Sequence, residues 1–268
     1  MAKACARFGW LAAAAAAVAV SSGVQAAQAV QPPPTPKQSP STAKAARFDG
    51  TWNLKTPPNI RYALNPPYRP EAKAKFDAER PQDDPGSRCT ESGLPRLMIT
   101  VYPMQLVALK DHILLVNEFN HVVRRVWTDK TARDPDHAAN FYGDGIVHWE
   151  GDVMVVDTVG LSAKNYLDPA GDLYSPKMHM VERWSLVTPN RLAIEFTFDD
   201  PETYTQPWKS TLTYDRVDWK LGEFSCTENN RNNPDDPKND PAFTSTKAPA
   251  PYGTAQPTAV GGANGSRN

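Results

Sequence analysis

The sequence predicts an all-β domain in which a single antiparallel meander closes into a barrel. About nine short β-prone runs follow one another between Pro95 and Thr227, with turn residues between them, which is typical of a meander. The run from Val153 to Val159 is β-branched almost throughout, and it is apolar on both faces except at Asp157 and Thr158. Such a strand lies at the centre of a sheet or in a barrel wall with further chain packed outside. A meander of this length removes its unpaired edges by closing.

The first residues have the layout of a cleavable signal peptide, which we place at residues 1–26. Basic Lys3 and Arg7 precede an apolar run over residues 10–20, and small residues end the segment at Ala26. A membrane anchor is the alternative, but the apolar run is shorter than the roughly 20 residues that span a bilayer. The sequence therefore predicts export to the periplasm or the medium, with no membrane span after the signal peptide is removed.

Two further segments have the composition of disordered chain. Residues 27–46 are rich in Gln, Pro and Ala and form a predicted linker, and residues 231–268 form a predicted C-terminal tail rich in Pro, Thr, Gly and Ala. Neither segment has the apolar residues needed to bury a core. The globular part is therefore predicted to be one β-barrel domain over residues 47–230.

Charge and motifs exclude several classes of protein. The 268 residues carry a net charge of −1 and contain no basic stripe, which argues against nucleic acid or an acidic membrane surface as a partner. The sequence has no Gly-rich phosphate loop and no strand–helix alternation, so a dinucleotide-binding fold is disfavoured and no cofactor is predicted. The sequence leaves a homodimer open.

The cysteines agree with an exported protein. Cys5 lies in the predicted signal peptide and is removed when that segment is cleaved. Cys89 and Cys226 then remain as an even pair in an oxidising compartment. We expect a disulfide between them, and two free buried thiols are the alternative. Two cysteines without a nearby pair of histidines do not make a zinc site, and no metal is predicted.

The elements of the domain are predicted in chain order, starting with a short strand around Trp52. The proline-rich stretch that follows contains one segment of helix-forming composition, Glu71–Arg80, which Pro70 precedes. After this helix we expect β-prone runs at Leu97–Val101, Gln105–Lys110, Ile113–Phe119, Val122–Thr128, Met178–Val187, Leu192–Phe198, Trp208–Val217 and Leu221–Thr227. A central hairpin within Gly145–Leu161 turns at Gly151, where glycine supplies the positive φ of a tight turn.

A set of motifs occurs together over residues 48–230. They are Cys89-x3-Gly93-x-Pro95-Arg96, Glu118-Phe119-Asn120-His121 with Arg124, Trp149-Glu150-Gly151-Asp152 leading into Val155-Val156-Asp157-Thr158-Val159-Gly160, His179 with Glu182-Arg183, Asp199-Asp200-Pro201 with Tyr204, Pro207 and Trp208, and Cys226-x-Glu228-Asn229. This combination resembles a large family of exported bacterial proteins, mostly without an assigned function. The resemblance implies a lipocalin-like barrel with Trp52 plugging one end, and it transfers no catalytic residues. The chain departs from the family pattern at Gly145, where the pattern has Ser, and at His148, where it has Arg.

Strand parity identifies Glu182 as an inward-facing acid. Alternate residues of the run 191–198 are large and apolar, so they form the interior face. Across the turn at residues 188–190, the same face is expected to include Glu182 and Trp184. Burial would raise the pKa of Glu182 and suit it to acid/base catalysis, unless a cation pairs with it. A buried Glu–Arg pair that only connects strands is the alternative.

A second group of polar residues, Glu118, Asn120 and Arg124, shares a parity with three valines. These residues either line a polar pocket or lie on a solvated outer face, and we favour the pocket. Arg124 would then hold an oxyanion, because its planar guanidinium suits two acceptor oxygens.

The best proton carriers are two of the five histidines. His121 lies beside the Glu118–Arg124 group, and His179 lies three residues before Glu182. A structural role is the alternative for each histidine.

These residues predict a cofactor-independent acid/base enzyme, a lyase or isomerase, that acts on a small apolar, aromatic compound inside the barrel. The predicted catalytic residues are Glu118, His121, Arg124, His179 and Glu182, and the predicted substrate-binding residues are Asn120, Tyr142, Asp144, His148 and Trp184. The aromatic side chains would grip a flat ligand, or alternatively fill the core. A non-catalytic carrier or sensor of a small hydrophobic ligand is the second hypothesis, and a protein that recognises other proteins through its tails is the third.

Overall fold

The structure is a computed structural model, and it describes residues 40–55, 61–63, 65–80, 83–130, 132–133, 135–228 and 230. The predicted signal peptide (residues 1–26) and the predicted tail (231–268) lie outside these residues. So does most of the predicted linker (27–46), whose last residues form helix α1 (Pro40–Ala45).

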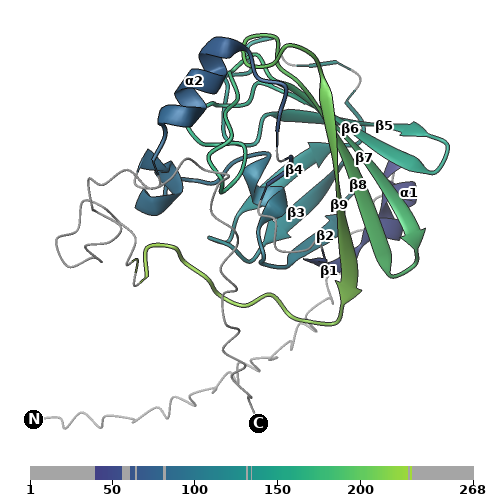
Figure 1. The fold of residues 1–268 in the computed structure, drawn as a ribbon. Coiled ribbons are helices and arrows are strands. Elements are labelled where there is room, and N and C mark those ends of the chain that lie inside the picture. Colours follow the sequence, from purple (N-terminus) through teal and green to yellow (C-terminus); the bar gives the residue numbers. More distant parts are fainter. Residues whose placement is uncertain are drawn as a thin grey trace, which may run out of the picture. The chain divides into compact units, whose positions relative to one another are not determined.

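The described chain forms a closed barrel of nine strands, which follow one another around the barrel in sequence order (Figure 1). The strands are β1 (Gly50–Leu54), β2 (Met104–Ala108), β3 (His112–Asn117), β4 (Val123–Trp127), β5 (Asp144–Glu150), β6 (Val153–Val159), β7 (His179–Thr188), β8 (Arg191–Asp199) and β9 (Trp208–Val217). Antiparallel pairing of β9 with β1 closes the barrel. The predicted all-β barrel is confirmed.

One ladder differs from a plain meander. Strands β4 and β5 are parallel, with Val126 opposite Gly145 and Trp127 opposite Ile146. The connection over residues 128–143 carries the chain back before β5 begins, so both strands run in the same direction. The other neighbouring strands pair antiparallel.

The helical segments are short. They are α1, η1 (Ala46–Phe48), α2 (Pro70–Ala78), η3 (Pro85–Arg88) and η4 (Arg96–Ile99). The predicted helix is confirmed as α2, with Pro70 in its first turn. The strand predicted at Leu97–Val101 is wrong, because three successive apolar residues are buried there in the 3-10 turn η4. The strand predicted at Leu221–Thr227 is also wrong, since that segment contributes an isolated bridge from Phe224 to Phe119.

Alternating residues of the long strands fill the interior, as strand parity predicts. On β8, the four residues Leu192, Ile194, Phe196 and Phe198 have no solvent exposure. On β7, Glu182 and Trp184 are buried on the matching face. The interior of this part of the barrel is therefore apolar and aromatic, with Glu182 set into it.

Aromatic side chains close both ends of the barrel. At one end, Trp52 is fully buried, donates from Nε1 to the carbonyl oxygen of Phe48 (2.8 Å), and stacks under the guanidinium of Arg216, 4.2 Å from the ring centroid. At the other end, the ring of Tyr62 lies 5.1 Å from both Phe196 and Phe198. Both side chains are buried, with Trp52 0% and Tyr62 6% exposed.

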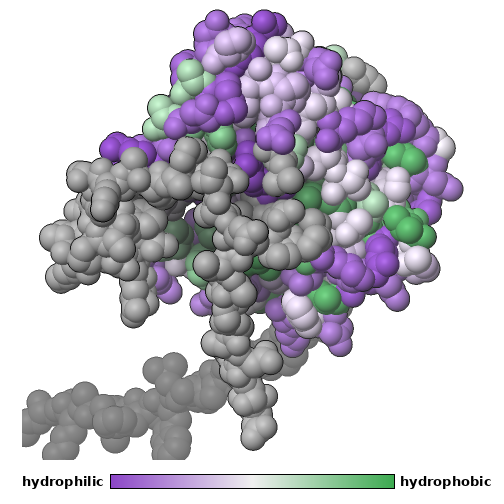
Figure 2. Space-filling view, in the orientation of Figure 1, coloured by the Kyte–Doolittle hydropathy of each residue, from purple (hydrophilic) through white to green (hydrophobic). Residues whose placement is uncertain are grey.

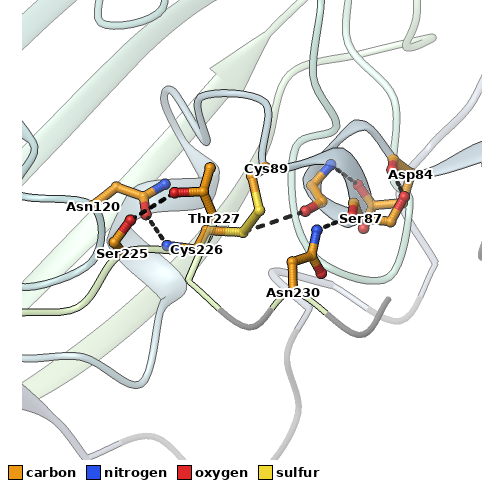
Figure 3. The surroundings of a disulfide bond; sticks show 9 residues. Asp84, Ser87, Cys89, Asn120, Ser225, Cys226, Thr227 and Asn230 are labelled. Carbon is orange, nitrogen blue, oxygen red and sulfur yellow. Dashed lines mark hydrogen bonds between the residues drawn. A yellow bond between two sulfur atoms is a disulfide. The ribbon is translucent and has the colours of Figure 1, made fainter. Parts of the chain in front are cut away.

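A disulfide attaches the C-terminal segment to the barrel. Cys89 and Cys226 are bonded, with Cα atoms 5.5 Å apart (Figure 3). Beside the bond, Asn120 Oδ1 accepts a hydrogen bond of 2.6 Å from the backbone of Cys226, and Asn230 donates to the carbonyl oxygen of Ser87. The predicted pairing is confirmed, and it agrees with an exported protein.

The outward-facing residues are mostly polar. Figure 2 shows a largely hydrophilic face on which hydrophobic residues are scattered. The exposed large hydrophobic residues of the described chain are Val101, Val123, Val187 and Trp219. Within the described residues no helix is both long and apolar enough to cross a membrane.

The disulfide yields the first prediction. Replacing Cys226 by Ser should lower the free energy of unfolding by about 2–5 kcal/mol, because the bond joins residues 137 positions apart and restrains the unfolded chain. Urea denaturation of the oxidised protein measures this change, and reduced wild-type protein should behave like the variant. Ser225→Ala is the control that keeps the bond. A Cys226→Ser protein within about 0.5 kcal/mol of wild type would contradict the prediction.

Candidate functional site

A buried ion pair lies at the centre of the barrel interior. Arg124 on β4 and Glu182 on β7 have fully buried side chains. Arg124 Nη1 donates to Glu182 Oε1 at 3.0 Å, and Nη2 donates to Oε2. The same Nη2 donates to Thr158 Oγ1 on β6 at 3.2 Å. The pair is therefore bidentate and connects strands that are not neighbours in the sheet.

Strand alternation explains why these residues meet. On β4, Arg124 faces inward between the buried side chains of Val122 and Val126. On β6, Thr158 is the polar member of an inward face that also contains Val156. Removing both charges from water costs several kcal/mol per ion, which the short contacts between them must offset.

Two buried tyrosines lie close enough to this pair for its charges to shift their pKa values. Burial raises the pKa of Tyr214 well above its usual value, and the nearby charge of Glu182 raises it further. Burial also raises the pKa of Tyr62, with smaller contributions from Tyr214 and Glu182. Tyr62 donates to the carbonyl oxygen of Pro95 at 2.8 Å, and the hydroxyl of Tyr214 also donates to a main-chain carbonyl. Both phenols are therefore neutral structural donors.

Two buried donors on inward faces of the barrel have no hydrogen-bond partner in the described part of the chain. Among the described residues, Arg124 Nε and Trp184 Nε1 are buried without a hydrogen-bond partner. Trp184 lies two residues beyond Glu182 on the same inward face of β7. Buried donors without acceptors are costly, because each has lost its bond to water. Each of these two donors is thus able to donate to an oxygen acceptor.

The predicted polar pocket of Glu118, Asn120 and Arg124 does not form, because the first two residues lie in the turn after β3. Glu118 Oε2 accepts a bond of 2.7 Å from the backbone nitrogen of Gly222. Asn120 holds the backbone of Cys226, as described above. Both side chains therefore anchor the C-terminal segment.

The turn also explains why strand parity wrongly placed Glu118 and Asn120 on the same face as Arg124. Asn120 and His121 have φ angles of 55° and 54°, so the chain reverses and the alternation of β3 does not continue into β4. His121 is exposed at this turn. It is therefore not brought to Arg124.

His179 belongs to a charged cluster on the outer face of the barrel wall. Its Nε2 lies 3.0 Å from Asp157 Oδ2, and Arg133 also pairs with Asp157. Asp144, at the start of β5, is buried, and its Oδ1 lies 3.8 Å from Nζ of Lys130. Because Asp157 and His179 alternate with the inward residues of their strands, these groups do not meet Glu182.

The remaining predicted binding residues are dispersed. His148 is exposed, with Nε2 3.5 Å from Glu150 Oε1. Tyr142 is half-buried just before β5, and burial together with Glu91 raises its pKa. Of the ten residues predicted for the site, the structure brings Arg124 and Glu182 into contact, and Trp184 lies two residues beyond Glu182 on the same inward face of β7.

A second buried cluster was not predicted. Asp168 and Asp172 lie in the irregular connection between β6 and β7 and are fully buried. Arg61 donates to both carboxylate oxygens of Asp172 at 2.9 and 3.0 Å, and Tyr68 donates to Oδ1 at 2.7 Å. Burial raises the pKa of Asp168 well above its usual value, and the charge of Asp172 adds to this shift. An Asp-x3-Asp spacing within a loop gives no periodic signal, so sequence reasoning missed it.

The described residues contain no group of three or more His, Cys, Asp or Glu side chains placed to hold a metal ion. Scanning the chain against models of known protein families gave no match, and no curated protein matches its sequence.

The ion pair yields the second prediction. Glu182→Leu should lower the free energy of unfolding by about 3–5 kcal/mol, because it leaves the guanidinium of Arg124 buried without its counter-ion. The double variant Arg124→Met/Glu182→Leu should recover most of this loss, since no buried charge remains. Urea denaturation of the single and double variants measures the coupling.

The exposed pair Lys209–Glu195 is the control for this cycle. Its nitrogen–oxygen distance is 2.8 Å, but both side chains are more than a third exposed, so Glu195→Gln should change stability by less than about 1 kcal/mol. Additive losses in the double variant at the centre would contradict a coupled pair.

Asp168 yields the third prediction. Its folded-state pKa lies above the unfolded value of 3.8, so its protonated form stabilises the protein fully below pH 3.8 and this contribution is lost as the pH rises through the folded pKa. Asp168→Asn removes the titration and keeps one acceptor oxygen, for the backbone nitrogen of Tyr62. It loses the oxygen that accepts from the backbone nitrogen of Ala170, a loss that does not depend on pH. The difference in unfolding free energy between variant and wild type should therefore grow from about pH 4 towards pH 8. A difference that is independent of pH would contradict this assignment.

Proposed function

We propose that the barrel binds a small, flat, apolar molecule that carries an oxygen acceptor. The observation that carries the proposal is the pair of buried donors, Arg124 Nε and Trp184 Nε1, which have no acceptor among the described residues. The interior around them is aromatic, with Phe196 and Tyr214 fully or almost fully buried. Aromatic walls with a few oriented polar groups are typical of small-molecule sites.

The proposed setting is the periplasm or the medium, after removal of the signal peptide. The disulfide supports an oxidising compartment, and the closed barrel is compatible with the lipocalin-like family that the motifs resemble. The net charge of −1 favours a small molecule over nucleic acid or a membrane surface as the partner. A homodimer is compatible with this proposal.

A carrier or sensor is the form of this function that the geometry supports best. His121 and His179 lie at a turn and on the outer face, so neither reaches Glu182 as a proton carrier. Glu182 is itself engaged by two nitrogens of Arg124. Binding through donors that are still unpaired leaves this ion pair intact.

A cofactor-independent lyase or isomerase is the second candidate, and the burial of Glu182 beside Thr158 and Arg124 favours it. In this mechanism, Arg124 stabilises negative charge that develops on the ligand oxygen, and Glu182 accepts and returns the proton. In an isomerisation, the proton that Glu182 takes from one carbon of the ligand is returned to another carbon as the double bond moves, so no co-reactant is needed. In a lyase reaction, the proton goes to the leaving group, whose bond to the neighbouring carbon breaks as the new double bond forms. Conversion of a bound ligand by wild type, lost in Glu182→Gln, would distinguish this candidate from a carrier.

The fourth prediction tests binding with two naphthalene probes, 2-acetylnaphthalene and 2-naphthoate. Isothermal titration calorimetry should detect binding of at least one probe to wild type. Trp184→Phe should then weaken binding about three- to tenfold, because it removes one N–H donor and keeps an aromatic ring. Trp219→Phe is the matched control, since Trp219 is 53% exposed and far along the chain from β7. Absence of binding to wild type, or equal affinity in Trp184→Phe, would contradict the proposal.

A further inference from the structure

Three half-buried aromatic side chains, Tyr102, Phe119 and Phe224, lie against one another beside the C-terminal segment, and we call them the aromatic surface. The ring centroid of Phe224 lies 4.4 Å from that of Tyr102 and 5.2 Å from that of Phe119, and the last two are 5.3 Å apart. None of the three belongs to the buried core of the described chain. The bridge between Phe119 and Phe224 and the nearby disulfide hold these separate segments together.

Further apolar side chains are exposed in the segments that carry the aromatic surface. Of the four exposed large hydrophobic residues of the described chain, three lie within five positions of one of its members: Val101 (71% exposed), Val123 (50%) and Trp219 (53%). The fourth, Val187, lies on β7. Exposed apolar side chains are thus concentrated in these segments, and apolar surface gathered on the outside of a protein marks an interaction site.

The predicted C-terminal tail, residues 231–268, begins close to the aromatic surface. Asn230 donates from Nδ2 to the carbonyl oxygen of Ser87 at 2.8 Å, next to the disulfide (Figure 3). Phe224 is six residues before Asn230, so the chain holds these two residues at most about 22 Å apart. The first eleven residues of the tail span up to about 40 Å when extended. The tail is therefore long enough to reach across the aromatic surface.

The composition of the tail matches the chemistry of this surface. The tail contains six prolines: Pro234, Pro237, Pro241, Pro249, Pro251 and Pro257. Because the proline ring fixes φ, a proline-rich segment loses little conformational entropy on binding, and such segments dock where aromatic side chains are presented. Tethering also gives the tail an effective concentration on the order of millimolar, which favours it over a second copy of the protein at micromolar concentration.

We propose that the proline-rich part of the tail, residues 234–251, docks on the aromatic surface of its own chain. Its prolines pack against the rings of Tyr102, Phe119 and Phe224 and against the exposed apolar side chains beside them. The tail thereby covers apolar surface that the folded barrel leaves exposed. This interaction is independent of any molecule bound by the barrel.

Limited proteolysis with chymotrypsin tests the docking, because Phe243 lies within the docked residues. The protein without its predicted signal peptide (residues 27–268) is compared with a synthetic peptide of residues 231–268, and mass spectrometry follows the release of residues 244–268. Cleavage after Phe243 should be at least about fivefold slower in the protein, since a docked segment is cut only while it is undocked. Equal rates in protein and peptide would overturn the proposal without the need for any variant.

Two matched variants locate the docking site. Val101→Asp places a charge beside Tyr102 at a position that is 71% exposed, and it should remove most of the protection at Phe243. Val187→Asp makes the same change at a position that is 61% exposed on β7, and it should leave the protection unchanged. Full protection in Val101→Asp, or an equal loss in both variants, would overturn the assignment to the aromatic surface.

The dependence on protein concentration distinguishes the tail of the same chain from that of a second copy. Protection by a tethered segment should be the same from about 1 to about 100 µM protein, because its effective concentration is set by the tether. Protection that increases over this range would show that the tail of one copy occupies another, and it would overturn docking within one chain.

Discussion

The bidentate contact between Arg124 and Glu182 is the interaction on which the interior depends. Both side chains are fully buried, so each charge relies on the other in place of water. The contact joins β4 to β7 across the barrel, and these two strands are not hydrogen-bonded neighbours in the sheet. The two buried charges make the centre of the barrel polar. Most of the inward residues that pack around them are apolar.

Both charges of this centre are buried, and buried aromatic side chains pack elsewhere in the same interior. Trp52 and Phe48 form one plug, and Tyr62 forms the other against β8. Tyr62 is held in turn by its bonds to Pro95 and to Asp168, so the buried carboxylates of the β6–β7 connection contribute to this second closure. A low-dielectric interior strengthens the ion pair and also makes any unpaired donor beside it more costly.

Several polar residues that resemble catalytic groups have structural partners. Glu118 and Asn120 hold the segment that the disulfide also fixes, and His179 belongs to the ion-paired cluster around Asp157 on the outer face. In this protein these polar side chains anchor the C-terminal segment or pair with charges on the outer face. Buried donor atoms that lack a partner in the described chain, such as Arg124 Nε, are the more informative guide to a binding site.

The sequence by itself determined the barrel and the inward direction of Glu182, because strand alternation is visible in the order of apolar and polar residues. It also determined the pairing of Cys89 with Cys226, because only these two cysteines remain after the predicted signal peptide. Only the tertiary structure decided that Arg124 meets Glu182, that β4 and β5 run parallel, and that Asp168 lies against Asp172. These features depend on turn conformations, such as the left-handed Asn120, and on contacts between distant segments. Neither leaves a periodic signal in the chain.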